Sequence, residues 1–168
     1  MLKTLKREDI SYAAERCWAL YQDPVTRCYP VSACQRDMEL AFAGELQNKD
    51  AKFLGYWADQ KLAGVCSFSC EKENQYLRVL SIYAWDAVEL ALEAFLLAIE
   101  SENAGYLVEI AIAPENRNAA AALVLHGYSV TETSLDLRYD PFSVNVALNK
   151  MEGIAFLDDE GDDEFEEY

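Results

Sequence analysis

The sequence predicts one α/β (α+β) domain, in which a central, mixed and twisted sheet of about six to seven strands is flanked by about four helices. Three observations predict this class. The chain has 168 residues and is 52% apolar, which is enough for one substantial core. Segments of two-residue alternation are interleaved with segments of helical periodicity. Residues 107–113 are almost all apolar, as in a strand covered on both faces.

The N-terminal part predicts one strand followed by a helix. Residues 2–5 alternate between apolar and polar side chains, which is typical of a half-buried strand. The motif REDI at 7–10 then opens a helix, with Asp9 or Ser11 as its N-cap. We expect this helix to stop at Asp23, because the residue before a proline disfavours helical geometry.

A second helix and a hairpin follow. Apolar residues at helical spacing predict a helix over about 32–48. Residues 52–58 and 61–70 have the composition of strands, and the two polar residues between them, Asp59 and Gln60, predict a tight turn.

The middle of the chain predicts a strand, a helix and a second strand. Residues 76–83 form the first of these strands, and the helix after it is expected to begin with Asp86 as its cap and to end at Gly105. The strand 107–113 follows. The apolar face of the helix consists of Val88, Leu92, Phe95, Leu96 and Ile99.

The last predicted elements are a helix, a hairpin and one further strand. The alanine-rich helix 116–126 ends at Gly127, where a left-handed C-cap is expected. Residues 128–133 and 135–139 predict the hairpin. Alternation within 142–148 predicts an extra strand, added to a sheet edge or donated to a second subunit.

Charge divides the chain further. The formal net charge is −16, and residues 158–168 carry eight acidic and no basic side chains. We therefore predict a domain over 1–140, a C-terminal extension over 141–157 and an acidic tail over 158–168. Direct binding of nucleic acid is not expected, because phosphates require a basic footprint. The tail is either a solvated end, a binding segment for a basic protein, or a mimic of nucleic-acid charge.

Cysteine usage and apolar distribution indicate a cytoplasmic protein. The five cysteines form no CxxC pair and only one histidine accompanies them, so we expect free thiols and no metal. No apolar segment is long enough to span a membrane, and the N-terminus does not resemble a signal peptide. The cysteines are Cys17, Cys28, Cys34, Cys66 and Cys70.

Three segments together resemble the GNAT N-acetyltransferases. The REDI motif is similar to the opening strand-to-helix turn of this family, and ADQKLAGV (58–65) is similar to its β2–β3 hairpin. Residues with the spacing of its closing motif are Asn116, Ala119, Gly127 and Tyr128. The resemblance covers about residues 2–140. It implies a GNAT-like fold, acetyl-CoA as cofactor and N-acyl transfer as the activity.

The sequence departs from the family pattern at two places. The family holds the pyrophosphate of acetyl-CoA on a loop of pattern Q/R-x-x-G-x-G/A, whereas residues 81–91 contain neither glycine nor a basic residue. We expect the Asp86 carboxylate to occupy the start of the following helix in place of an anion. Many members also have a tyrosine that protonates the leaving thiolate, and Leu123 stands there.

Candidate site residues follow from the resemblance and from one buried carboxylate. Glu109 lies among apolar residues of the predicted strand and is the candidate base, with a raised pKa if it points inward. The alternative for Glu109 is that it faces a groove or pairs with an arginine such as Arg78. Positions matching the family's cofactor site are Tyr83, Ala84, Trp85, Asp86, Ala87 and Asn116.

Three functions remain open at this point. The chain is either an atypical acetyl-CoA-dependent N-acyltransferase, or a non-catalytic binding or assembly module that acts through its C-terminal extension and acidic surface. In the second case, residues 142–168 would contact a basic protein or a second subunit. The third reading is an inhibitor that presents carboxylates in place of nucleic-acid phosphates.

Overall fold

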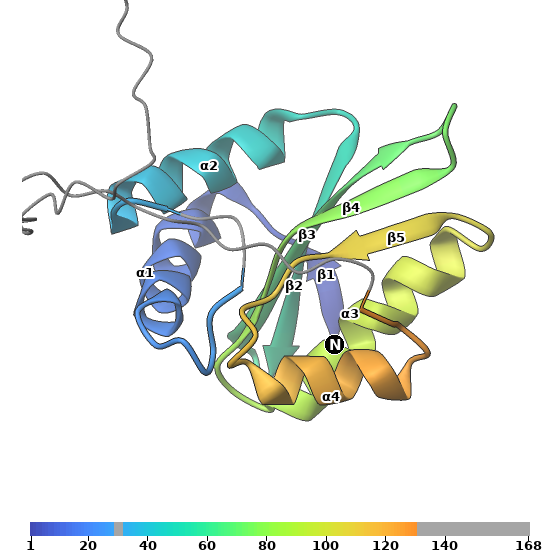
Figure 1. The fold of residues 1–168 in the computed structure, drawn as a ribbon. Coiled ribbons are helices and arrows are strands. Elements are labelled where there is room, and N and C mark those ends of the chain that lie inside the picture. Colours follow the sequence, from blue (N-terminus) through green and yellow to red (C-terminus); the bar gives the residue numbers. More distant parts are fainter. Residues whose placement is uncertain (29–31, 131–168) are drawn as a thin grey trace, which may run out of the picture. The chain divides into compact units, whose positions relative to one another are not determined.

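The computed structural model describes residues 1–28 and 32–130, and these form a mixed α/β fold around one sheet (Figure 1). The strand order is β1-β2-β3-β4-β5, antiparallel except for the parallel β4–β5 pair. The predicted fold class is therefore confirmed, with five strands in the described residues against six to seven expected. The strands are β1 (Leu2–Thr4), β2 (Ala51–Ala58), β3 (Lys61–Glu71), β4 (Tyr76–Ala84) and β5 (Leu107–Ile110).

Four α-helices occur in the described part of the chain, as predicted. Figure 1 shows α1 and α2 on one face of the sheet, and α3 and α4 on the other. Of the C-terminal elements, Tyr128–Val130 are described and form no strand, while the rest of the hairpin, strand 142–148 and the acidic tail lie outside the described residues. The helices are α1 (Ile10–Tyr21), α2 (Gln35–Gln47), α3 (Val88–Glu102) and α4 (Arg117–Leu125).

The starts of the first two helices differ from the sequence prediction. A 3₁₀ turn, Arg7–Asp9, precedes α1, and the Asp9 carboxylate accepts a hydrogen bond from the Lys6 N–H (3.0 Å) rather than from a residue of the helix. Ser11 lies inside α1. Helix α2 begins at Gln35, three residues after the predicted Ser32.

The predicted tight turn between β2 and β3 is confirmed. Asp59 and Gln60 have positive φ values of 47° and 66°, the geometry of a type I′ hairpin turn. Strand pairing starts directly beside the turn, with Ala58 opposite Lys61.

Apolar helix faces cover both sides of the sheet. Phe42 of α2 packs edge-on against Phe53 of β2 at 5.0 Å, and Phe95 of α3 meets Tyr56 at 6.4 Å on the opposite face. All five cysteines are free, and Cys17, Cys28 and Cys66 belong to this core. Burial of these aromatic and aliphatic side chains is the main favourable term for the fold.

Strand β5 is shorter and more exposed than predicted. It spans four residues instead of 107–113, and Leu107 is 69% exposed. Beyond it, Ile112 pairs with Cys28 in an isolated bridge. The apolar run is therefore divided between a strand and a connection, and each half packs against a different neighbour.

The end of α4 confirms the predicted left-handed C-cap. Gly127 has φ +86°, its N–H donates to the Val124 carbonyl, and the Tyr128 N–H donates to the Leu123 carbonyl (3.0 Å each). This pair of hydrogen bonds is a Schellman motif. His126 is the C-cap residue, and its Nδ1 also lies 3.1 Å from a Glu100 carboxylate oxygen of α3.

Two glycine-to-alanine substitutions should have opposite effects on stability. Gly127→Ala should destabilise the fold by about 1 kcal/mol, because a side chain disfavours the left-handed backbone. Gly44→Ala, inside α2, should stabilise it by about 1 kcal/mol through helix propensity. At both positions an added Cβ meets nothing within 4 Å, so only the backbone term differs. Urea denaturation of both variants measures this, and equal shifts would contradict the C-cap assignment.

Candidate functional site

A cleft opens where β4 and β5 separate. The two strands pair only from Tyr76/Leu107 to Val79/Ile110, and an extra residue in β4, Leu80, breaks the β3–β4 register at this point. Beyond it lies a cleft of about 150 Å³ between the end of β4, the start of α4 and the connection after α1. Its lining is Leu20, Val25, Thr26, Cys28, Ile82, Tyr83, Ala84, Trp85, Val88, Leu92, Asn116, Asn118 and Ala119.

Four of the six predicted cofactor positions line this cleft, namely Tyr83, Ala84, Trp85 and Asn116. Asp86 and Ala87 follow in the turn into α3 and are not part of the lining. The predicted positions thus lie in two walls of the cleft, the end of β4 and the start of α4. It missed the third wall, contributed by the 20–28 segment, and Asn118 on α4.

Tyr83 and Trp85 form walls of the cleft because both are anchored to backbone. The Tyr83 hydroxyl donates to the Cys28 carbonyl (2.7 Å), and the Trp85 Nε1–H donates to the Leu62 carbonyl (2.9 Å). Burial raises the pKa of Tyr83 well above its usual range. The phenol therefore stays neutral and structural at ordinary pH.

Asn116 connects three segments and is 5% exposed. Its Nδ2 donates to the Arg27 carbonyl (3.2 Å), and its Oδ1 accepts from the Ala119 N–H (3.1 Å), which makes it the N-cap of α4. The Ala113 N–H donates to the same Arg27 carbonyl (3.2 Å). The polar atoms of Asn116 are thus engaged within the protein.

The turn from β4 into α3 contradicts the predicted Asp86 cap. The N-cap position is Ala87, with left-handed φ 47° and no side-chain cap hydrogen bond, and Asp86 is exposed. The backbone N–H groups of Trp85 and Asp86 both donate to the Ala63 carbonyl (2.9 and 3.1 Å). The two carboxylates near this helix start, Asp86 and Glu89, remain solvent-exposed.

The first turn of α3 therefore keeps free donors. The first helical hydrogen bond runs from the Ala91 N–H to the Ala87 carbonyl, so the N–H groups of 88–90 have no helical acceptor. A helix start of this kind favours an anion. A cation beside the preceding residue Trp85 is Arg16 of α1, whose guanidinium lies 6.0 Å from the centre of the Trp85 ring.

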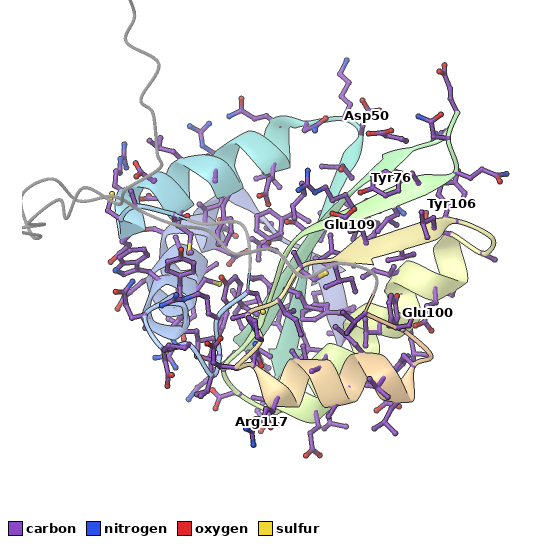
Figure 2. The ribbon with its side chains drawn as sticks, viewed as in Figure 1. Asp50, Tyr76, Glu100, Tyr106, Glu109 and Arg117 are labelled. Carbon is purple, nitrogen blue, oxygen red and sulfur yellow. The ribbon has the colours of Figure 1, made fainter. Side chains whose placement is uncertain are left out.

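Glu109 lies outside the cleft and pairs as the alternative interpretation expected. Its carboxylate accepts a hydrogen bond from the Tyr76 hydroxyl and lies 3.6 Å from the Arg78 Nε, with half of its side chain exposed. The inward orientation expected of the candidate base is not observed. Figure 2 shows Glu109 beside Tyr76 and well away from Arg117, which starts α4.

The lining contains no Asp, Glu, His, Lys or Arg among the residues that the structure describes. Burial raises the pKa of the one thiol in it, Cys28, to about 12, so no thiolate nucleophile is present near neutral pH. The cleft can hold an apolar or weakly polar group, and it offers no general base of its own.

Within 1–28 and 32–130, no group of three or more His, Cys, Asp or Glu side chains is arranged to hold a metal ion. No helix in the same residues is long and apolar enough to cross a membrane.

Comparison with known proteins identifies the fold. No family model and no curated protein matches the sequence. Solved structures match over most of the chain, although at low identity. One is a predicted acetyltransferase with acetyl-CoA from Clostridium acetobutylicum, which is 11% identical with a TM-score of 0.58 over 82% of this chain and 95% of its own.

Two further structures agree with this match. The ribosomal-protein-alanine N-acetyltransferase of Brucella melitensis biovar Abortus 2308 is 17% identical, with a TM-score of 0.52 over 83% of this chain and 98% of its own. A probable acetyltransferase (GNAT family) from Chromobacterium violaceum is 18% identical, with a TM-score of 0.54 over 75% of this chain and 72% of its own. The chain has an acetyltransferase-like fold. In particular, it is the GNAT fold that the sequence resemblance predicted.

The contacts of Asn116 predict a clear difference between two asparagines of the cleft. Asn116→Ala should destabilise the fold by about 2–3 kcal/mol, because it removes the α4 cap and a donor to a buried carbonyl. Asn118→Ala, at an exposed cleft position, should change stability by no more than about 0.5 kcal/mol. Chemical denaturation of the two variants tests this. Equal decreases in the free energy of unfolding would show that the hydrogen bonds of Asn116 do not stabilise the fold.

Proposed function

We propose that this protein binds the acyl end of an acyl-CoA, acetyl-CoA being the first to test, in the cleft between β4 and α4. The observation that carries the proposal is the position of the cleft at the point where β4 and β5 separate, next to free N–H groups at the start of α3. The fold is shared with a structure that contains acetyl-CoA. We further propose that it acts in the cytoplasm.

The size of the cleft limits what it accommodates. Pockets for drug-sized ligands have volumes of about 300–1,000 Å³, and this one measures about 150 Å³. An acetyl group, its thioester and the adjoining methylenes match such a space, whereas the nucleotide of coenzyme A would lie outside it. The largely apolar lining suits the acyl end.

The pyrophosphate would be held weakly. Glycine is absent from 81–91, and the N–H groups of Trp85 and Asp86 are already bound to Ala63. The remaining donors are those of 88–90, with Arg16 as a nearby cation and with Asp86 and Glu89 opposing an anion. The cofactor site is thus reduced, and most affinity should come from the acyl end.

Acyl transfer on this scaffold would depend on positioning. The cleft supplies no base and Leu123 supplies no proton to the leaving thiolate, so the amine must arrive deprotonated and a backbone N–H must polarise the carbonyl. Direct attack would form the C–N bond of the amide and break the C–S bond of the thioester. The amine proton would pass to solvent, and coenzyme A would leave as its thiolate and take a proton from solvent. We therefore propose slow N-acyl transfer that accelerates as the amine loses its proton.

Two tryptophan substitutions on α4 test ligand binding. Asn118→Trp should fill the cleft and weaken acetyl-CoA binding at least about tenfold, because the indole occupies the volume of the acyl end. Ala121→Trp places the same side chain at an exposed position outside the lining and should leave affinity unchanged. Isothermal titration calorimetry measures both. Absence of acetyl-CoA binding to the unmodified protein at millimolar concentration would contradict the proposal.

A second candidate function is a non-catalytic binding or assembly module. It is favoured by the way the protein itself uses the polar atoms of Asn116, Tyr83 and the 85–86 backbone. The partner would be a basic protein or a second subunit contacted through 142–168. Deletion of 141–168 should then abolish self-association or partner capture and leave the melting temperature of the domain unchanged. Light scattering and thermal denaturation of both forms check this, and unaltered association after deletion would overturn it.

A further inference from the structure

One carboxyl oxygen is buried without a partner on the face of the sheet that carries α1 and α2. Glu45 belongs to α2, and its Oε2 is inaccessible to solvent and has no hydrogen-bond partner. It makes no ion pair with any residue in 1–28 or 32–130. A charged carboxylate in this position would be strongly destabilised by the loss of hydration.

The neighbours of Glu45 are hydroxyls and thiols. The Ser67 hydroxyl of β3 lies within reach of the carboxyl group and 2.7 Å from the Ser81 hydroxyl of β4. Both serines are almost completely buried and stand opposite each other in the β3–β4 ladder. The titratable groups facing Glu45 are Cys17 of α1 and Cys66 of β3.

These neighbours cannot balance a negative charge. Burial raises the pKa of both the Cys17 and Cys66 thiols far above neutrality, so they stay uncharged and neither adds to nor offsets the charge of Glu45. Burial also raises the pKa of Glu45 from 4.5 to about 7, and the hydrogen bond from Ser67 opposes this only in part. The protonated carboxyl group is the form that fits the site.

We propose that Glu45 is a proton-binding switch of the fold. A chain of hydrogen bonds through Glu45, Ser67 and Ser81 then links α2 to β4. When Glu45 is protonated, it can donate to Ser67, which then donates to Ser81. When Glu45 is ionised, both hydroxyls must reverse and donate toward the carboxylate. Ser81 directly precedes Ile82 and Tyr83 of the cleft, so the chain ends beside the proposed binding site.

The sign of the effect follows from proton linkage. Between pH 4.5 and about 7 the folded protein holds a proton on Glu45 that the unfolded chain has released. Stability from this group is therefore complete below about pH 4.5 and is lost progressively as the pH rises through 7. The inference concerns folding and does not depend on acyl-CoA binding.

The test compares unmodified protein with Glu45→Gln in urea denaturation between pH 5 and 8. The unfolding constant of the unmodified protein should rise relative to that of the variant by roughly 50- to 100-fold over this range. All other titrating groups, including the only histidine, are common to both proteins and cancel. Parallel curves for the two proteins would overturn the proposal.

Two further measurements keep the proposal testable if Glu45→Gln folds poorly. Infrared spectra of the unmodified protein should show the carbonyl band of a protonated carboxyl group at pH 5.5 and lose it by pH 8.5, and a missing band would contradict the proposal. Ser67→Ala removes a hydrogen bond to the carboxylate and should move this transition to higher pH. Ser81→Ala removes an equally buried hydroxyl and should move it less. The reverse order would refute the chain.

Discussion

The constraint on which this structure depends is the parting of β4 and β5 after Val79. Where the two strands separate, backbone groups lose ladder partners, and a buried carbonyl or N–H without a partner is costly. Beside this parting, side chains bond the backbone of the segment after α1, since Asn116 donates to the Arg27 carbonyl and Tyr83 donates to the Cys28 carbonyl. The segment after α1 is thereby held as a third wall, and the cleft exists because this wall is fixed.

The same solution limits the chemistry of the cleft. A polar atom that satisfies the backbone of its own chain is not available to a ligand, and this applies to Asn116, to Tyr83 and to the N–H groups of Trp85 and Asp86. A ligand would find an apolar space and the N–H groups of residues 88–90 in the first turn of α3. The proposed acyl-CoA site would therefore offer few of the groups that catalysis or pyrophosphate binding would use.

Much of the fold could be predicted from the sequence, because its signals are local. The left-handed C-cap at Gly127 is predicted from that glycine alone, and the two-residue hairpin turn is predicted from Asp59 and Gln60 alone. The Asp86 prediction was wrong because Ala87, in the left-handed conformation, takes the N-cap position and Asp86 lies one residue before it. The contribution of Thr26 and Cys28 to the cleft depends on the distant bridge to Ile112, for which no local pattern exists.

The burial of a carboxylate is also difficult to predict from the sequence. Glu109, in an apolar strand, attracted attention as a candidate base, yet it lies at the surface between Tyr76 and Arg78. Glu45, in an ordinary amphipathic helix, is the carboxylate whose oxygen is buried without a partner. Apolar neighbours along the chain therefore did not decide burial. Tertiary packing did, since α2 packs against α1 and β2 and one carboxylate oxygen of Glu45 is buried there, where the neutral form is favoured.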